Sequence, residues 1–526
     1  MTTQELSGQP EQPIEQPAHP IDGREVSADL HSEAIAAETR AVADATRAVA
    51  DATRLTSTDR EATRYLSAAT QINIRYAETV VSKVINEPFR ALAPTFGVDV
   101  PVVTKWALKA LRTRARRDYI LAAIFVLIFP LLALSFLWLQ GLILFALLLI
   151  AAWQTVSWEY WERLHNIVIN KMLRDRFDPG EAPSPSNESD RTRLEEVAKR
   201  RDGNLVVFSG HSAFIGSGQK LHYERLLLDV SRGREAEDGT PMDPDHFTSQ
   251  DLNTAIARAF DHKTGLARSL TNIRVHERLF VNGLHIQNDE LLLPDHLRPP
   301  PSSIDEDLLT AATLHPAPEA RTYVCVEMPG WQGQLVVTLF IRAVHTGESL
   351  YIDWTFQGIP PLRDEFLVID RYHELTRSRQ LGASLRFSLR ETIPALLRSP
   401  YVALRTLGRP HSVRRHQSRQ SRMIERGYLF DYGAQRSIRE EACGRRRQHY
   451  FLARDEAMYM LLAQQTLTRA VEMFLKDHNV DLGQFNEQVK VIFDNSIKVG
   501  DISNSTGVTI GDNSSSKVND SPKGAK

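Results

Sequence analysis

The longest apolar run of the chain, Tyr119 to Trp158, is the feature that most constrains its fold. No charged residue interrupts the run between Asp118 and Glu159. A single helix of this length would extend roughly 60 Å, about twice the hydrocarbon thickness of a bilayer. We therefore expect a two-helix transmembrane hairpin, with its break near Gln140. The alternatives are a hairpin that enters one leaflet only and a helical pair buried in a soluble core.

The flanks of this run predict its orientation. Six cations lie between Lys105 and Arg117, and four lie between Arg163 and Arg176. By the positive-inside rule, both flanks face the cytoplasm. The sequence thus predicts a multi-pass protein of the cell membrane with both termini in the cytoplasm. Because the run holds no ionisable residue, we expect an anchor rather than an ion or proton path.

Changes in composition divide the chain into segments. The first residues are rich in Gln, Glu and Pro and cannot bury enough apolar surface to fold. The heptad-like Ala- and Arg-rich region that follows is either a self-associating stalk or a solvated helix. The predicted segments are a disordered N-terminus (1–30), a helical Ala- and Arg-rich region (31–118), the transmembrane hairpin (119–158), a juxtamembrane helix (159–181), a linker (182–202), a cytoplasmic α+β domain (203–370), an Arg-rich arm (371–428), C-terminal helices (429–482) and a polar tail (483–526).

The cytoplasmic domain carries strand signals with short connections. The runs "RTYVCVEMP", "GQLVVTLFIRAV" and "SLYIDWTFQ" follow one another with Gly-containing turns between them, which indicates an antiparallel meander. Asn282 and Gly283 predict a tight hairpin turn after an earlier strand. "TSQDLNTAIARAF" predicts a capped amphipathic helix. The predicted fold class is α+β, with an antiparallel sheet and packed helices, anchored by the membrane hairpin.

The Arg-rich arm holds thirteen arginines, no lysine and three acids between Arg371 and Arg426. Interspersed Leu, Ile and Tyr make this composition suitable for an arm that lies on anionic lipid headgroups. A nucleic-acid-binding arm and a solvated linker are the alternatives. The residues expected to face lipid are Arg398, Arg405, Arg409, Arg414 and Arg415.

Signals for chemistry are few. Gly210, Gly216 and Gly218 follow a predicted strand, and their backbone N–H groups are candidates for binding a phosphate. Their spacing matches neither nucleotide-binding pattern, so a wide turn is the alternative. No metal-ligand spacing is present, and the two cysteines, Cys325 and Cys443, indicate no disulfide scaffold. We expect no cofactor and no metal, and the sequence does not indicate an enzyme.

Several motifs carry a family resemblance. "NLVVFSGHSAFIGSG", "RVHERLFVNG" and "LYIDWTFQGIPPLRDEFLVID" resemble an uncharacterised family of actinobacterial membrane proteins with two membrane helices. The resemblance implies a shared architecture and no activity.

The tail contains an imperfect repeat, in which Val499-Gly500-Asp501 returns as Ile510-Gly511-Asp512, with Val508 nearby. Alternating apolar and polar side chains in both copies predict short strands. The second copy resembles RIP homotypic interaction motifs and amyloid-signalling motifs, with Thr509 in the place of the usual glutamine. This resemblance implies self-association, or a partner with a similar tail, and a disordered tail is the alternative.

Together these features predict a membrane-anchored, non-enzymatic scaffold or signalling adaptor. A membrane-associated enzyme, or a protein that binds a phosphorylated ligand through the 210–218 loop, is the alternative. Nucleic acid is not an expected partner of the whole chain, because the net charge is −2.

Overall fold

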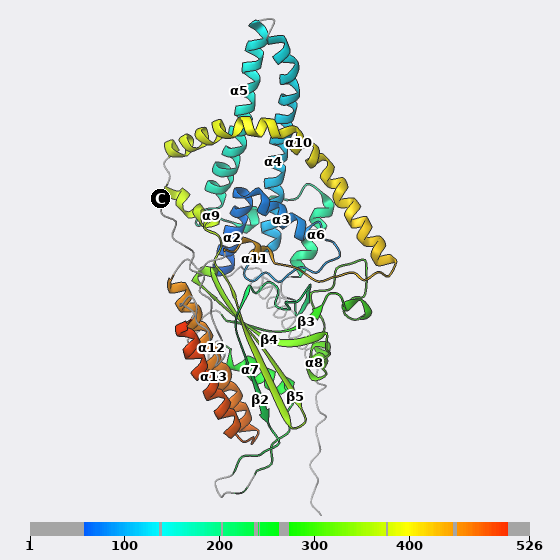
Figure 1. Cartoon of the computed structure of the whole chain (residues 1–526), viewed down its shortest axis with the longest axis vertical. Coiled ribbons are helices and arrows are strands. Elements are labelled where there is room, and N and C mark those ends of the chain that lie inside the picture. Colours follow the sequence, from blue (N-terminus) through cyan, green and yellow to red (C-terminus); the bar gives the residue numbers. More distant parts are fainter. Residues whose placement is uncertain are drawn as a thin grey trace, which may run out of the picture. The chain divides into compact units, whose positions relative to one another are not determined.

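The computed structural model describes residues 57–135, 139–200, 203–235, 240, 242–261, 273–374, 377–444 and 450–502 (Figure 1). The predicted disordered N-terminus, residues 1–30, lies outside these ranges. The α-helices are α2 (Ser57–Ile72), α3 (Ile74–Val84), α4 (Val100–Ser135), α5 (Leu139–Trp161), α6 (Glu188–Lys199), α7 (Ser249–Ala259), α8 (Glu306–Leu314), α9 (Asp364–Leu367), α10 (Arg377–Glu425), α11 (Ile438–Ala442), α12 (Tyr450–Asp477) and α13 (Gly483–Ile502). The strands are β1 (Leu205–Phe208), β2 (Gln219–Asp229), β3 (Arg274–Asn282), β4 (Ala320–Gly330), β5 (Leu335–Thr346) and β6 (Ser349–Ile359). A π-helical turn, η1 (Glu162–Ile169), continues α5.

The six strands form one mixed sheet in the order β1-β3-β4-β5-β6-β2. Strands β4 to β6 make the predicted antiparallel meander, in which Cys325 of β4 faces Phe340 of β5, and β3 pairs with β4 in antiparallel orientation. Strand β2 adds to β6 in antiparallel orientation. The prediction of a wholly antiparallel sheet is wrong at the other edge, because β1 pairs in parallel with β3. The chain between these two strands includes β2 and α7, which is long enough for the crossover that parallel pairing requires.

The Asn282-Gly283 pair does not form a two-residue hairpin. Strand β3 ends at Asn282, and its antiparallel neighbour β4 begins only at Ala320. Gly283 instead allows two segments of the chain to lie close together. A Cβ on Gly283 would lie 2.1 Å from the backbone nitrogen of Gly433.

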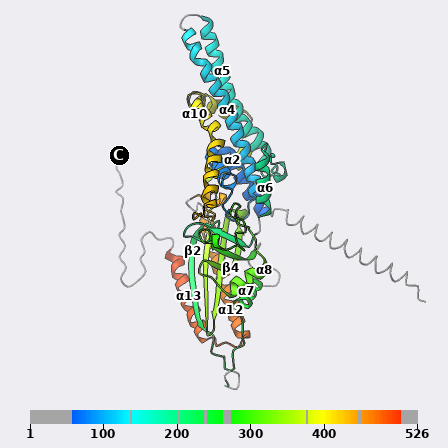
Figure 2. The same cartoon turned by 90° about the vertical axis from the view of Figure 1, so that its right-hand side faces the viewer.

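Helices cover one face of the sheet. Leu252 and Ile256 of α7, Leu467 and Val471 of α12, and Phe485 of α13 are buried with the sheet in one apolar core. Figures 1 and 2 show α12 and α13 alongside the strands. The predicted helix is α7, and a capping box at its N-terminus, formed by Thr248 and Asp251, fixes where it begins.

A second core is helical. Buried side chains of α2, α3, the first half of α4, η1, α6, α9 and α11 pack together. Helix α6 occupies most of the predicted linker, residues 182–202, where Leu194 and Val197 hold it against this core. The linker prediction is therefore wrong for Glu188–Lys199, since two apolar positions are enough to dock a short helix whose other side chains remain solvated.

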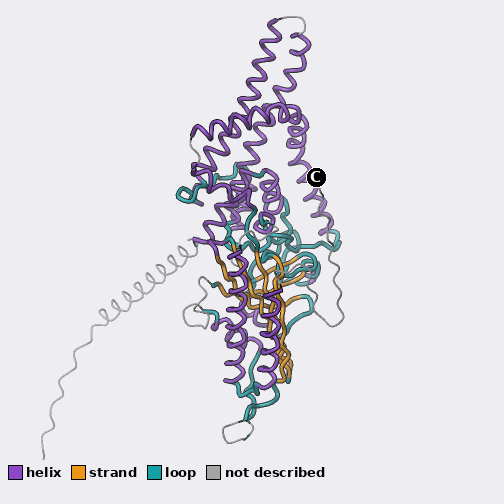
Figure 3. Tube along the Cα trace, turned by 60° about the vertical axis from the view of Figure 1, so that its left-hand side comes forward, coloured by secondary structure: helices purple, strands orange, loops and turns teal. Residues whose placement is uncertain are grey.

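Two long helical features leave this core. Helices α4 and α5 run side by side and project from it as a hairpin, and this part of the molecule contains no strand among the described residues (Figure 3). Helix α4 is continuous from the basic flank into the apolar run. The Arg-rich arm is a helix, α10, which crosses the base of the hairpin (Figure 1).

Candidate functional site

The hairpin presents apolar side chains that no described part of the chain covers. The exposed residues are Ile120, Val126 and Leu127 of α4 and Leu142, Ile143, Leu144, Leu147 and Ile150 of α5. Among the described residues, one helix, Gly141–Ile169, is long and apolar enough to cross a membrane, and only 17% of its apolar window is buried. The two-helix arrangement is present, but this test supports one span rather than two.

A cluster of buried charges lies at the base of the hairpin. The carboxylate of Glu159, on α5, is fully buried and lies 2.5 Å from Arg163 and 3.8 Å from Arg117 of α4. Arg117 also contacts Asp118 at 2.5 Å. Buried charges are tolerated only when they are paired, so these contacts hold the two helices in one register. Burial, followed by repulsion from Arg117, lowers the pKa of the neighbouring Arg114.

Helix α10 docks on the hairpin just beyond this cluster. Its Ala395 and Leu396 are buried against apolar residues of α4 and α5. The indole Nε1 of Trp153 donates a hydrogen bond of 3.0 Å to the Ser388 hydroxyl, and the ring of Tyr160 stacks on a phenylalanine of α10 at 4.4 Å. The helix is thus fixed to α5 by specific contacts.

Proline residues inside α10 are accommodated locally. Pro394, Pro400 and Pro410 lie within the helix. A proline removes the hydrogen bond to the carbonyl four residues earlier. The hydroxyl of Ser399 donates a hydrogen bond of 2.7 Å to the carbonyl oxygen of Leu396. This carbonyl lacks its usual backbone donor because residue 400 is a proline. The helix therefore continues across the hairpin.

Helix α10 exposes large apolar side chains between its arginines. A ridge of large side chains follows it at mostly four-residue spacing, and each is at least 49% exposed. We call this set the α10 ridge; it consists of Leu381, Leu385, Leu389, Ile393, Leu397, Tyr401, Leu404 and Leu407. A ridge of this size on a water-facing helix is unusual, because large exposed apolar patches mark interaction or membrane surfaces.

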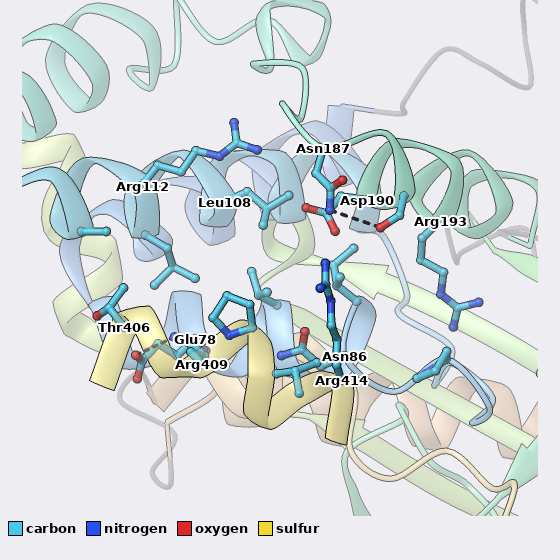
Figure 4. A pocket seen from close by; sticks show the side chains of 18 of the residues that line it. Glu78, Asn86, Leu108, Arg112, Asn187, Asp190, Arg193, Thr406, Arg409 and Arg414 are labelled. Carbon is cyan, nitrogen blue, oxygen red and sulfur yellow. Dashed lines mark hydrogen bonds and ion pairs between the residues drawn. The ribbon is translucent and has the colours of Figure 1, made fainter. Parts of the chain in front are cut away.

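Beneath α10 lies a cavity of about 1550 Å³, bounded by α3, α4, α6, α10 and the segment 297–303 (Figure 4). Of the arginines predicted to face lipid, Arg398, Arg409 and Arg414 line this cavity, whereas Arg405 and Arg415 are exposed elsewhere on α10. The structure therefore divides the predicted set between residues that line this open cavity and residues that do not. We call this space the basic cavity.

The glycine-rich loop after β1 has the unusual backbone that the sequence indicates. Gly210, Gly216 and Gly218 all have φ between +82° and +92°. The N–H groups of Gly216 and Gly218 donate to one oxygen of Glu440, at 3.1 and 3.0 Å. Glu440 also completes a capping box with Ser437 at the start of α11. An internal carboxylate thus occupies the donors proposed for phosphate, and an anionic ligand would have to displace it.

The sequence did not predict Glu440 as the hydrogen-bond partner of the glycine-rich loop. Glu440 lies 224 positions beyond Gly216, and only the fold brings the two together. The one local signal, a serine three residues before a glutamate, indicates a helix cap and not a partner for a distant loop.

The tail is described only in part. Val499, Gly500 and Asp501 lie within helix α13, so the strand predicted for the first repeat copy is wrong. The second copy, with Val508, Ile510, Gly511 and Asp512, lies outside the described residues. The interaction role of both copies stays a prediction.

Other groups offer little chemistry. No group of His, Cys, Asp and Glu side chains within the described ranges has the geometry to hold a metal ion. Burial raises the pKa of Cys325 to about 12 and that of Cys443 to about 11. Because the thiolate is the reactive form, neither cysteine is a nucleophile at neutral pH.

The fold and this surface define a class of protein: an α+β domain joined to an exposed apolar helical hairpin. The chain belongs to the AbeC-like domain family, whose model matches residues 224–512, more than half of the chain. The matched region begins inside β2 and includes α10, but the hairpin precedes it. No curated protein and no solved structure matches the chain. Membership thus defines the family and transfers no activity.

Proposed function

We propose that this chain is a membrane-anchored scaffold or signalling adaptor. The α4–α5 hairpin enters the bilayer, and α10 lies in the interface with the α10 ridge among the acyl chains and its arginines among the headgroups. The α+β domain and both termini then lie on the cytoplasmic side, the orientation that the positive-inside rule favours for the basic flanks of the hairpin. The tail recruits further copies, or a partner with a similar tail.

One observation carries the anchoring part of this proposal. The hairpin and the α10 ridge both expose large apolar side chains, and the two elements meet at the contacts of Trp153 and Leu396. Leaving this apolar surface in water would cost about 25 cal/mol for each Å². A bilayer removes that cost, and its interface suits a helix that combines leucines with arginines.

The arrangement of charges supports the same placement. The buried cluster around Glu159 lies at the point where exposed apolar side chains give way to polar ones. Trp158 and Tyr119 lie beside it on the two helices, and amphipathic aromatic rings of this kind favour the headgroup level. The hairpin would therefore enter the bilayer from the charge cluster outward.

The adaptor role rests on the tail. The rival function, binding of a phosphorylated ligand by the 210–218 loop, requires N–H groups that Glu440 now occupies. A membrane anchor also raises the local concentration of tails, which favours self-association through weak contacts.

The full chain reconstituted in lipid vesicles tests both parts. Flotation of the vesicles after a carbonate wash measures anchoring, and chemical cross-linking within them measures self-association. We expect Leu144→Asp with Leu147→Asp to abolish flotation, because a charge at the bilayer centre costs about 2.5–3.5 kcal/mol. We expect Ile510→Asp to leave flotation intact and to reduce cross-linking.

The matched control is Leu227→Asp, which changes an exposed leucine of β2 far from the hairpin. It should affect neither measurement. Wild-type protein that washes off with carbonate would overturn the anchor. Cross-linking that is unchanged in Ile510→Asp would overturn the tail-mediated adaptor role and leave the anchor standing.

A further inference from the structure

The basic cavity has more positive than negative charge. Ten basic and five acidic side chains line it. Three of the acids are already matched inside it: Glu78 with Arg409 at 3.0 Å, Asp118 with Arg117 at 2.5 Å and Glu196 with Arg193 at 3.3 Å. The cavity therefore keeps an excess of cations after its internal pairs are formed.

Four arginines of the cavity form no ion pair within 4.0 Å in the described part of the chain. They are Arg112 of α4, Arg398 and Arg414 of α10, and Arg200, whose guanidinium donates a hydrogen bond of 3.4 Å to the carbonyl of Pro300. Figure 4 shows Arg414 projecting from α10 into the space, with Arg112 on the helix opposite. A guanidinium presents its donors in the planar fork geometry that binds phosphate oxygens, and Arg112 and Arg414 supply such groups from two helices that border the cavity.

Two cations of the cavity, Arg193 and Arg200, are partly removed from water. Burial, followed by repulsion from Arg193, lowers the pKa of Arg200, and burial lowers that of Arg193. An anion in the cavity would stabilise the charged form of both groups. Burial also raises the pKa of Asp190, against the effect of Arg112.

The cavity also has apolar lining residues. Tyr119, the first residue of the apolar run, lines it together with Leu108, Leu111 and Val402. A volume of about 1550 Å³ exceeds that of most small-ligand sites, which hold about 300–1000 Å³. The space is thus large enough for a phosphorylated headgroup and the first part of its acyl chains.

We propose that the basic cavity binds a phosphate monoester, held by Arg112 and Arg414, with Arg398 at its edge. The ligand is either the headgroup of an anionic lipid or a soluble phosphorylated compound, since both present the same group. This proposal rests on the proposed membrane anchoring only for the lipid source. In this proposal the arginines of α10 form a defined binding site, in addition to their general attraction to an anionic surface.

Calorimetry on the full chain in detergent micelles tests the site without requiring insertion into a bilayer. The probes are dihexanoyl phosphatidic acid, glycerol 3-phosphate and dihexanoyl phosphatidylcholine. We expect phosphatidic acid to bind and phosphatidylcholine not to bind. Arg112→Gln and Arg414→Gln should each weaken binding roughly tenfold, the scale of one lost charge-assisted hydrogen bond.

Arg419→Gln is the matched control, because Arg419 is exposed on the same helix and does not line the cavity. It should leave the affinity unchanged. Glycerol 3-phosphate that binds as tightly as phosphatidic acid identifies a soluble ligand, and binding of phosphatidic acid alone identifies a lipid. Binding of phosphatidic acid no tighter than phosphatidylcholine, or equal weakening by Arg419→Gln, would overturn the site. Failure of the anchor would instead appear in the flotation measurement.

Discussion

Glu159 is the residue on which the base of the hairpin depends. Its carboxylate is fully buried and faces Arg114, Arg117 and Arg163. Without this carboxylate, the three arginines would still lie close together, and Asp118 would be the carboxylate left beside them. The cost of such a change is the cost of leaving buried charge uncompensated rather than the value of one ion pair.

Glu159→Gln should therefore lower the free energy of unfolding by about 3–5 kcal/mol, the range for breaking a buried ion pair. The measurement is a denaturant titration of the full chain in detergent, together with hydrogen exchange of residues 110–120 and 155–165, which should become faster. Glu162→Gln is the control, because Glu162 is partly exposed and lies 3.9 Å from Lys109. Its effect should stay within about 1 kcal/mol. Equal effects of the two substitutions would contradict the role of the buried cluster.

At the residue scale, the sequence predicted backbone conformation better than it predicted which distant residues form contacts. The positive φ values of Gly216 and Gly218 agree with the prediction of an unusual turn. The ligand of their N–H groups could not be predicted, because Glu440 is distant in sequence and its local pattern indicates a helix cap. Which arginines of α10 line the basic cavity depends in the same way on the packing of α10 against α4 and α5.

At the scale of elements, local signals were correct where one pattern dominated. The strands of the meander and the capped helix α7 lie where their patterns predict them. Helix α10 was not assigned as a helix, because its three prolines and many arginines are typical of a linker. Tertiary contacts with α4 and α5 stabilise it, and a side chain such as Ser399 replaces a lost backbone donor.

The Asn282-Gly283 pair shows why a turn motif can mislead. The glycine is needed for the close contact with Gly433 and not for a hairpin. Gly283→Ala should lower the free energy of unfolding by about 1–3 kcal/mol, the usual cost of overpacking a dense contact. Gly382→Ala, on α10 with nothing within 4 Å of the added Cβ, should instead stabilise the protein by about 0.5–1 kcal/mol. Thermal unfolding in detergent compares the two, and a neutral Gly283→Ala would contradict the close contact.

At the scale of the whole molecule, the apolar run and its basic flanks predicted the main division of the chain. They could not predict that α10 would lie across the base of the hairpin, because that contact joins residues more than 200 positions apart, such as Trp153 and Ser388. The α+β class followed from the order of strand and helix signals. The parallel pairing of β1 did not, since no local pattern sets the partner of a short strand.

The central claim is that the hairpin and the α10 ridge enter a bilayer to different depths. Spin labels placed at Leu144, Leu404 and Leu227 of the full chain in lipid vesicles test it most directly, in a background with Cys325→Ala and Cys443→Ser. Collision with oxygen, relative to a water-soluble nickel complex, measures the depth of each label. We predict a deep position for Leu144, a shallow position below the headgroups for Leu404, and water for Leu227, which is exposed on β2. Labels at Leu144 and Leu404 that are as accessible to the nickel complex as the label at Leu227 would contradict the account.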